Sequence, residues 1–264
     1  AAGFNIAAGG FSKAFNKGEE GIASTRGMMR ENGITPAGIF ENSRERQILT
    51  VDANGVRTAV LQYTDTVAAA TRKNMIKNGT GDMVPAADAE SIAADIERAR
   101  EEGAEVVLVF LNWGKTGKAP DKNMRTLAQQ IADAGADLII GNGSRIVSGA
   151  EMLTAGGSGR EVLCVWSLGT TLSGDRGNIK RMAGMLLQAT ISAESGKAEV
   201  TEVCYIPVYT WKYKQDSRFY YRCLAADQPA PDGMDSEQQK MMKKAAETIR
   251  NAMKDSPVEE RKSE

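Results

Sequence analysis

The chain has 264 residues, of which 42% are apolar and 25% charged, a balance typical of a soluble globular protein with a sizeable core. Lys and Arg number 33 and Asp and Glu number 34, so the formal net charge is −1. This gives no electrostatic reason to expect nucleic acid or an anionic membrane as a partner. There is no histidine, which excludes histidine metal ligands, histidine general bases and Ser-His-Asp triads.

The ends of the sequence carry no targeting signal. Residue 1 is Ala rather than Met, and no basic stretch precedes an apolar one. We interpret the sequence as a processed chain or a piece of a longer one. The longest apolar run near the middle, residues 106–111, is too short to cross a membrane, so we expect no membrane span in this chain.

The first third of the sequence predicts a helix, a hairpin and a loop. Apolar residues at helical spacing predict a helix over 19–32, ended by Gly33. Two strand-like runs, 47–51 and 56–64, flank Asn54-Gly55, a pair that favours a tight hairpin turn. The polar segment 65–87 is expected to be a long loop that covers a site or faces a partner.

The middle of the sequence alternates between helix and strand patterns. We predict a helix over 88–102 that Asp88 caps, a buried strand over 106–111, a helix over 121–134 and a short strand over 138–140. This alternation is typical of an α/β unit with parallel strands.

The last part of the sequence changes to a pattern of strands. Runs at 161–168, 185–191, 200–211 and 218–224, with a turn at Ser195-Gly196, predict antiparallel strands stacked beside the parallel part. Residues 225–235 resemble a linker, and residues 236–254 predict a closing helix. The last ten residues are polar and are expected to be frayed.

The three cysteines are too few and too widely spaced for an all-cysteine zinc site or a disulfide framework. Cys164 lies in an apolar run and is expected to be a buried, inert thiol. A disulfide between Cys204 and Cys223 is an alternative that nothing in the sequence supports.

Four segments, in order, resemble motifs of the CapA family, which is associated with poly-γ-glutamate capsule synthesis and has a metallophosphoesterase-like fold. The family's Gly-Phe-Asp-Val and Ala-Asn-Asn-His-x-x-Asp-x-Gly motifs resemble residues 3–6 and the stretch up to Gly21. Its His-Trp-Gly resembles Asn112-Trp113-Gly114. The other two segments are Ala134-Gly-Ala-Asp-Leu-Ile-Ile-Gly141, with the residues up to Arg145, and Trp166-Ser-Leu-Gly-Thr170. The resemblance spans about residues 3–224.

The resemblance implies a fold and a location. The fold would be α/β, with two stacked mixed β-sheets flanked by helices in four layers (α/β/β/α), metallophosphatase-like and lacking the N-terminal strands. Residues 1–225 would form this CapA-like domain, and residues 226–264 a linker and a C-terminal helix that packs on it or extends from it. The family implies a location at the cell surface and capsule-synthesis proteins as partners.

The chain departs from the family at the positions that would face a metal. Lys13 and Asn16 replace a His and an Asp of the first motif. Asn112 and Arg145 replace the histidines of two later motifs, and Thr170 replaces an Asn. The family's earlier Gly-Asp and Asn-Leu-Glu motifs have no counterpart in this sequence.

These replacements change the chemistry that the site can perform. Protonated Lys and Arg cannot ligate a metal, and Asn offers only neutral amide oxygens, so we expect no metal and no cofactor. The two cations could instead hold a carboxylate or phosphate directly. The alternatives are that Lys13 and Arg145 pair with Glu19 or Glu151, and that Trp113 packs in the core instead of stacking on a ligand. The candidate ligand-binding residues are Lys13, Asn16, Asn112, Trp113, Asn142, Ser144, Arg145 and Thr170.

We therefore expect a capsule-related, CapA-like protein that acts by binding or scaffolding, with an anion such as polyglutamate or phosphate as its ligand. The alternative is a metal-dependent phosphoesterase or amide-bond hydrolase, which a missing N-terminal segment would complete with carboxylates. Ser144 and Ser167 have no histidine base, and nothing specific indicates a Ser–Lys pair with Lys13 or Lys115.

Overall fold

The computed structural model describes residues 3–42, 46–194 and 196–262. The helical elements are α1 (Gly18–Glu31), α2 (Ala69–Lys77), the 3₁₀ helix η2 (Gly81–Met83), α3 (Ala89–Glu101), α4 (Lys122–Asp133), α5 (Ile179–Met182) and α6 (Ser236–Met253). The strands are β1 (Ile6–Ala8), β2 (Thr35–Ala37), β3 (Leu49–Ala53), β4 (Val56–Thr64), β5 (Val106–Asn112), β6 (Leu138–Asn142), β7 (Ala150–Thr154), β8 (Glu161–Val165), β9 (Ala183–Glu194), β10 (Lys197–Gln215), β11 (Arg218–Ala225) and β12 (Glu259–Glu260).

The strands form one large sheet and two smaller ones. The large sheet has the order β3-β4-β5-β6-β8-β7, in which β4, β5, β6 and β8 run parallel and the two edge strands run antiparallel to their neighbours. A second sheet contains β9, β10, β11 and β12, and β1 pairs with β2 alone. Helices lie between β4 and β5 and between β5 and β6, since a parallel pair needs a crossover that returns the chain to the same end of the sheet, whereas β7 connects β6 to β8.

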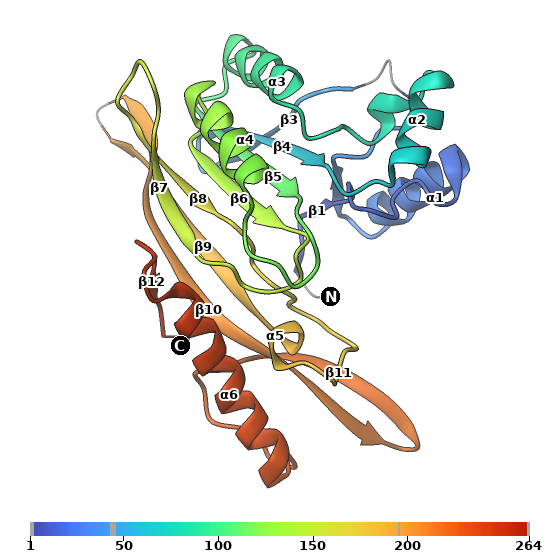
Figure 1. Cartoon of the computed structure of the whole chain (residues 1–264), viewed down its shortest axis with the longest axis vertical. Coiled ribbons are helices and arrows are strands. Elements are labelled where there is room, and N and C mark those ends of the chain that lie inside the picture. The colour runs from blue at the N-terminus through green and yellow to red at the C-terminus, as the bar shows by residue number, and fades with distance from the viewer. Residues whose placement is uncertain (1–2, 43–45, 195, 263–264) are drawn as a thin grey trace.

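The large sheet is covered on both faces, so its central strands β5 and β6 are largely apolar (Figure 1). Ile139 faces the side of α3 and α4, while its neighbours Leu138 and Ile140 face the second sheet. The helix α6 packs against β9 and β10, and its apolar side chains share one core cluster with both sheets. There the indole nitrogen of Trp211 in β10 donates to Gln238 Oε1 at 2.9 Å. The result is the mixed α/β architecture that was predicted, with a large mixed sheet packed on a second, smaller one.

Most of the predicted elements are confirmed with small shifts of their ends. Asp88 caps α3 and Asp121 caps α4, each by accepting a backbone N–H of the first turn at 3.0 Å. The hairpin turn lies at Asn54 and Gly55, both with positive φ. The predicted turn at Ser195-Gly196 includes Ser195, which lies outside the described residues.

The expected loop over 65–87 is wrong in part, because α2 and η2 lie within it. The apolar pattern of α2 is weak, and Met75 is its one buried side chain among the described residues. Met75 packs with Met83, Val84 and Ile22 in a small cluster beneath α1. Packing against this cluster, rather than helical periodicity, stabilises α2.

The expected fraying of the last ten residues is also wrong for residues 258–260, while residues 263 and 264 lie outside the described residues. Glu259 and Glu260 form β12, which pairs parallel to β10 at Cys204 and Tyr205. Val258 beside them is buried, and Arg250 of α6 holds Glu260 through two hydrogen bonds of 2.7 Å. The strands β1, β2 and β7 were not predicted either. These elements are too short to show a period of their own.

The cysteines are as the sequence indicated. Cys164 is fully buried in β8, and burial raises the pKa of its thiol well above the usual value. Cys204 and Cys223 are both free, so the alternative of a disulfide between them is not borne out. No helix among the described residues combines the length and the apolar character that crossing a membrane requires.

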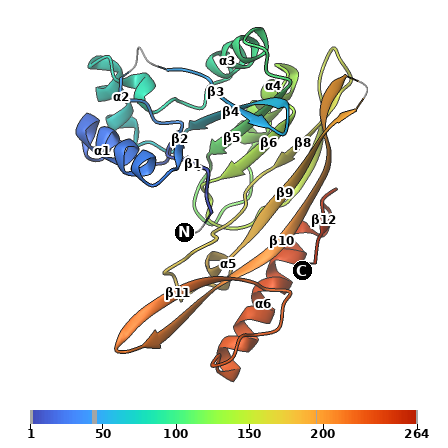
Figure 2. The same ribbon diagram turned by 180° about the vertical axis from the view of Figure 1, so that it is seen from behind.

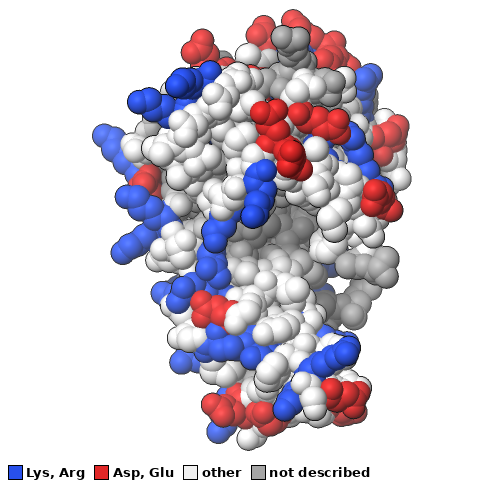
Figure 3. All heavy atoms as spheres, turned by 90° about the vertical axis from the view of Figure 1, so that its right-hand side faces the viewer, with Lys and Arg blue, Asp and Glu red and all other residues white. Residues whose placement is uncertain are grey.

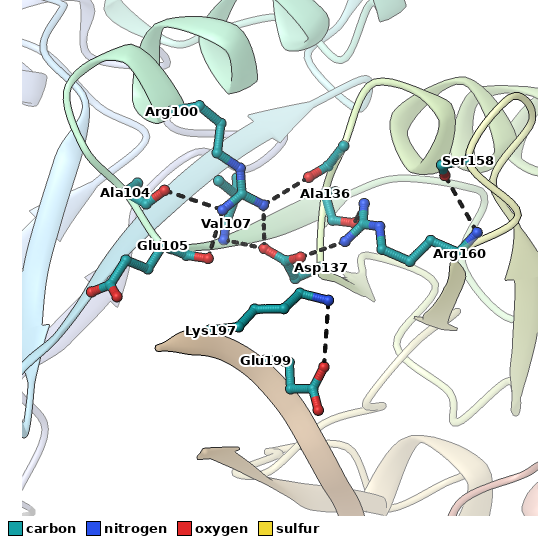
Figure 4. Close-up of polar contacts among 11 residues, drawn as sticks. Arg100, Ala104, Glu105, Val107, Ala136, Asp137, Ser158, Arg160, Lys197 and Glu199 are labelled. Atoms are coloured by element: carbon teal, nitrogen blue, oxygen red, sulfur yellow. Dashed lines mark hydrogen bonds and ion pairs between the residues drawn. The ribbon is translucent and has the colours of Figure 1, made fainter. Parts of the chain in front are cut away.

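An ion-pair cluster closes the amino end of the parallel strands (Figure 4). Asp137, just before β6, accepts from Arg100 of α3 at 2.5 Å, from the backbone N–H of Val107 at 2.7 Å, and from Arg160. Arg100 also donates to the backbone oxygen of Glu105 at 2.7 Å. One carboxylate thus links α3, β5 and the residue just before β8, Arg160.

We predict that Asp137→Ala lowers the free energy of unfolding by about 2–3 kcal/mol. The substitution leaves two arginines, each about one-third exposed, without their shared carboxylate. Urea denaturation measures the loss. The control is Glu102→Ala, which removes an exposed pair with Arg98 at 3.9 Å and should cost less than about 1 kcal/mol. Equal losses in the two variants would contradict the role assigned to Asp137.

Candidate functional site

Three parallel strands end in polar residues at the same edge of the large sheet. The register pairs Thr64 at the end of β4 with Asn112 at the end of β5, and Asn112 with Asn142 at the end of β6. The carboxyl ends of parallel strands are where open α/β folds bind their ligands, because the loops that follow diverge there. The strand-end asparagines singled out in the sequence therefore lie side by side.

A hollow of about 520 Å³ opens over this edge. Among the described residues that line it, Arg145 is the one charged side chain, and no Asp or Glu takes part. The remaining lining is polar or small, with two apolar exceptions, Phe11 and Leu172. The lining residues are Phe11, Ser12, Thr66, Asn112, Gly114, Thr116, Asn142, Gly143, Arg145, Gly169, Thr170, Thr171 and Leu172.

The side-chain oxygens of both asparagines already accept hydrogen bonds. Asn112 Oδ1 accepts from the hydroxyl of Thr66 at 2.6 Å, and Asn142 Oδ1 accepts from the backbone N–H of Gly143 at 2.9 Å. With these oxygens engaged, the NH₂ group of each amide is the part left to bond a ligand, and that group only donates. The asparagines are therefore better arranged for an anion than for a cation.

Arg145 occupies an unusual backbone conformation at the rim. Its φ is +63°, in the left-handed region that few side chains other than Gly, Asn and Asp adopt readily. Its backbone oxygen accepts from the hydroxyl of Thr170 at 3.2 Å, which joins the two rim loops. Glu151, one alternative partner, instead binds Arg125 at 2.6 and 2.7 Å. No ion pair of the Arg145 side chain is present among the described residues.

Trp113 and Ser144 do not reach the ligand face. The Trp113 side chain is fully buried, stacks on Trp166 with ring centroids 5.6 Å apart, and donates to its backbone oxygen at 3.0 Å. Ser144 is also buried and donates to the backbone oxygen of Ile146 at 3.1 Å. The Trp113 ring therefore packs in the core, as the alternative interpretation had it, and a role of either residue in binding stays a prediction.

Lys13 and Asn16 lie near the hollow without lining it. They stand in the turn that follows Phe11 and Ser12, where the backbone N–H of Asn16 donates to the oxygen of Lys13 at 3.1 Å. Both are exposed. The structure therefore brings together Asn112, Asn142, Arg145 and Thr170, and it leaves Lys13 and Asn16 beside them.

Sequence reasoning missed four hydroxyl residues of the lining, namely Ser12, Thr66, Thr116 and Thr171. Thr66 had a usable signal, because it follows the buried strand β4 by two residues, as functional residues at strand ends often do. The other three lie in loops whose path the sequence does not predict.

A second, acidic hollow of about 600 Å³ adjoins the first and shares Thr66 and Gly114 with it. Asp65, Asp88 and Asp121 line it, but the last two serve as helix caps. Among the described residues, no three His, Cys, Asp or Glu side chains are arranged to hold a metal ion. The amide, hydroxyl and guanidinium groups around Arg145 do not fit a divalent metal either, because they offer no anionic ligand.

The mixed α/β arrangement, with a polar hollow at the carboxyl edge of the parallel strands, is consistent with the metallophosphatase-like class. The sequence model of the bacterial capsule synthesis protein PGA_cap matches residues 1–175, and the chain belongs to this family.

Two curated proteins are similar to this chain. One is the PGA biosynthesis protein CapA of Bacillus subtilis (strain 168), 27% identical over 194 residues, which cover 72% of this chain and 48% of that protein. The other is the capsule biosynthesis protein CapA of Bacillus anthracis, 26% identical over 144 residues, which cover 53% of this chain and 34% of that protein. The chain thus spans less than half the length of each relative.

Proposed function

We propose that this chain serves in capsule biosynthesis by binding an anionic ligand in the hollow around Arg145, and that it acts by binding or scaffolding rather than by hydrolysis. The observation that carries the proposal is the lining itself, which combines one arginine with neutral donors and contains no carboxylate. Family membership supports the capsule-related part of the proposal. It also favours a place at the cell surface, beside other capsule-synthesis proteins.

The charges around the hollow suit a carboxylate or phosphate. Arg145 can grip either group with two parallel hydrogen bonds, and the NH₂ groups of Asn112 and Asn142 can add further donors. Figure 3 shows the side of the molecule that lies to the right in Figure 1, where Lys and Arg side chains run down one side and acidic side chains gather at the top and at the bottom. Lys13 would add attraction at longer range. In this proposal the metal site of the metallophosphatase-like fold is degenerate.

We predict that Arg145→Ala weakens anion binding about tenfold to hundredfold, because a hydrogen bond to a charged group contributes about 1.5–3 kcal/mol. Isothermal titration with glutamate oligomers, phosphate and sulfate measures the affinity. The control is Lys243→Ala, which removes the same charge from the exposed face of α6. Lys13→Ala tests the second cation and should have a smaller effect, since Lys13 lies outside the lining.

Two results would contradict the proposal. One is equal affinity of the parent protein and Arg145→Ala, or no binding at millimolar anion. The other is near-stoichiometric Mn, Zn or Fe in a longer polypeptide that contains this chain, which would favour the hydrolase alternative.

A further inference from the structure

The far end of the β10–β11 hairpin is a two-stranded ribbon. Pairing of β9 with β10 ends at Ala183 and Tyr209, whereas β11 pairs with β10 as far as Gln215 and Arg218. Residues 210–223, called here the distal ribbon, project away from the sheets, as Figures 1 and 2 both show. The distal ribbon lies outside residues 1–175, the part of the chain that the family model matches.

The outer edge of β11 has no neighbour among the described strands, since β11 ends its sheet. Its residues 218–223 are exposed throughout. Such an edge presents a row of unpaired backbone N–H and C=O groups, which is a template for another extended chain. With eight residues, β11 is long enough to bind such a chain over several hydrogen bonds.

The distal ribbon is strongly basic in a chain that is nearly neutral. It carries four cations, at Lys212, Lys214, Arg218 and Arg222, against one acid at Asp216, a net charge of +3, whereas the whole chain has −1. Two copies paired edge to edge through β11 would bring these charges together, which is unfavourable. The charge therefore selects an acidic partner rather than a second copy of this chain.

Exposed aromatic rings add apolar contact on both faces of the ribbon. Phe219 is 59% exposed, and Tyr220 and Tyr221 are each 40% exposed. Lys212 Nζ lies 4.0 Å from the centroid of the Phe219 ring. Opposed residues of an antiparallel pair share a face, so Lys212 and Lys214 lie on one face with Phe219 and Tyr221. The other face of β11 carries Arg218, Tyr220 and Arg222. Each face thus offers cations next to rings, which fits acidic side chains that alternate with apolar ones.

We propose that the outer edge of β11 takes up an extended acidic peptide segment of a partner protein as an added strand. Backbone hydrogen bonds would hold the segment, and the lysines and arginines would select its carboxylates. A lipid surface fits less well, because the tip itself is the polar turn at Asp216 and Ser217 while the rings stand behind it. This inference is independent of the anion site around Arg145.

The test uses a fluorescent peptide of alternating Glu and Val, matched in length to β11, and fluorescence anisotropy with the full chain. The control is the same peptide N-methylated at every second residue, which keeps its charge but lacks the backbone N–H groups needed to pair with β11. We expect it to bind at least about tenfold more weakly, because several backbone hydrogen bonds are lost. Hydrogen exchange should show alternate amides of β11 protected by the first peptide.

A charge-reversed variant, Arg218→Glu with Arg222→Glu, should lose binding about tenfold or more, since both cations become repulsive. Its matched control is Lys240→Glu with Lys243→Glu, two exposed positions on α6. Equal binding of both peptides would overturn the proposal in favour of attraction by charge alone. So would self-association that depends on β11, or binding to phosphatidylserine vesicles without binding to the peptide. Anion titration at Arg145 is unaffected by any of these outcomes.

Discussion

Gly141→Ala should destabilise the protein by about 3 kcal/mol, as overpacking of a rigid core does. A Cβ atom at this position would lie 2.2 Å from the backbone oxygen of Trp166 and 2.4 Å from the indole nitrogen of Trp113. Neither atom can move away easily. The two rings are stacked and fully buried, and the indole nitrogen donates to that same oxygen at 3.0 Å.

The matched control for this substitution is Gly27→Ala in α1. A Cβ at Gly27 meets no atom within 4 Å, and this glycine does not have a positive φ. Alanine should stabilise the helix there by about 0.5–1 kcal/mol. Urea denaturation of both variants measures opposite shifts of the midpoint. An unchanged midpoint for Gly141→Ala would mean that Trp113 and Trp166 move easily to make room for the new Cβ atom. It would contradict the view that their packing is rigid.

The α/β unit could be predicted from the sequence, because each of its helices and strands has a capping residue or an apolar pattern of its own. The helices α3 and α4 begin at capping aspartates and have clear apolar faces, and β5 is a continuous apolar run. The helix α2 and the strand β12 could not be predicted in this way. Each is held by contacts with residues far away in the sequence, as Met75 is by Ile22 and Glu260 is by Tyr205.

The same distinction applies to the candidate site. Motif positions and strand ends identified Asn112, Asn142, Arg145 and Thr170, which the structure brings to one hollow. The burial of Trp113 could not be predicted, because it depends on Trp166, 53 residues later in the chain. The positions of the Lys13 and Asn16 side chains depend on the path of a turn, and the motif does not determine that path. Their role in binding stays a prediction.

A second buried cluster should have the other large effect on stability. Asp95 of α3 accepts from the hydroxyl of Tyr63 at 2.7 Å, from Arg98 at 3.0 Å and from Arg46. The side chains of Asp95 and Arg46 are only 10% and 17% exposed. This carboxylate joins α3 to β4 and to the segment before β3.

Asp95→Ala is expected to lower the free energy of unfolding by about 3–5 kcal/mol, because it leaves buried cationic and hydroxyl groups without their acceptor. Tyr63→Phe removes one neutral donor from the same carboxylate and should cost only about 1 kcal/mol. Urea denaturation of the single and double variants gives their coupling energy. Strictly additive losses would contradict a shared cluster.

The pH dependence of stability provides an independent test of the cluster. Burial, together with the neighbouring Asp95, raises the pKa of Tyr63 far above its ordinary value near 10. Above about pH 10 the unfolded phenol loses its proton while the folded one keeps it, so the unfolded state binds fewer protons and stability falls as pH rises. Burial and Glu260 likewise raise the pKa of Tyr205 to about 12, and that contribution is present in both proteins.

The parent protein should therefore lose stability more steeply than Tyr63→Phe between about pH 9 and pH 11. Parallel curves for the two proteins would show that the phenol of Tyr63 is not held in its neutral form by this cluster.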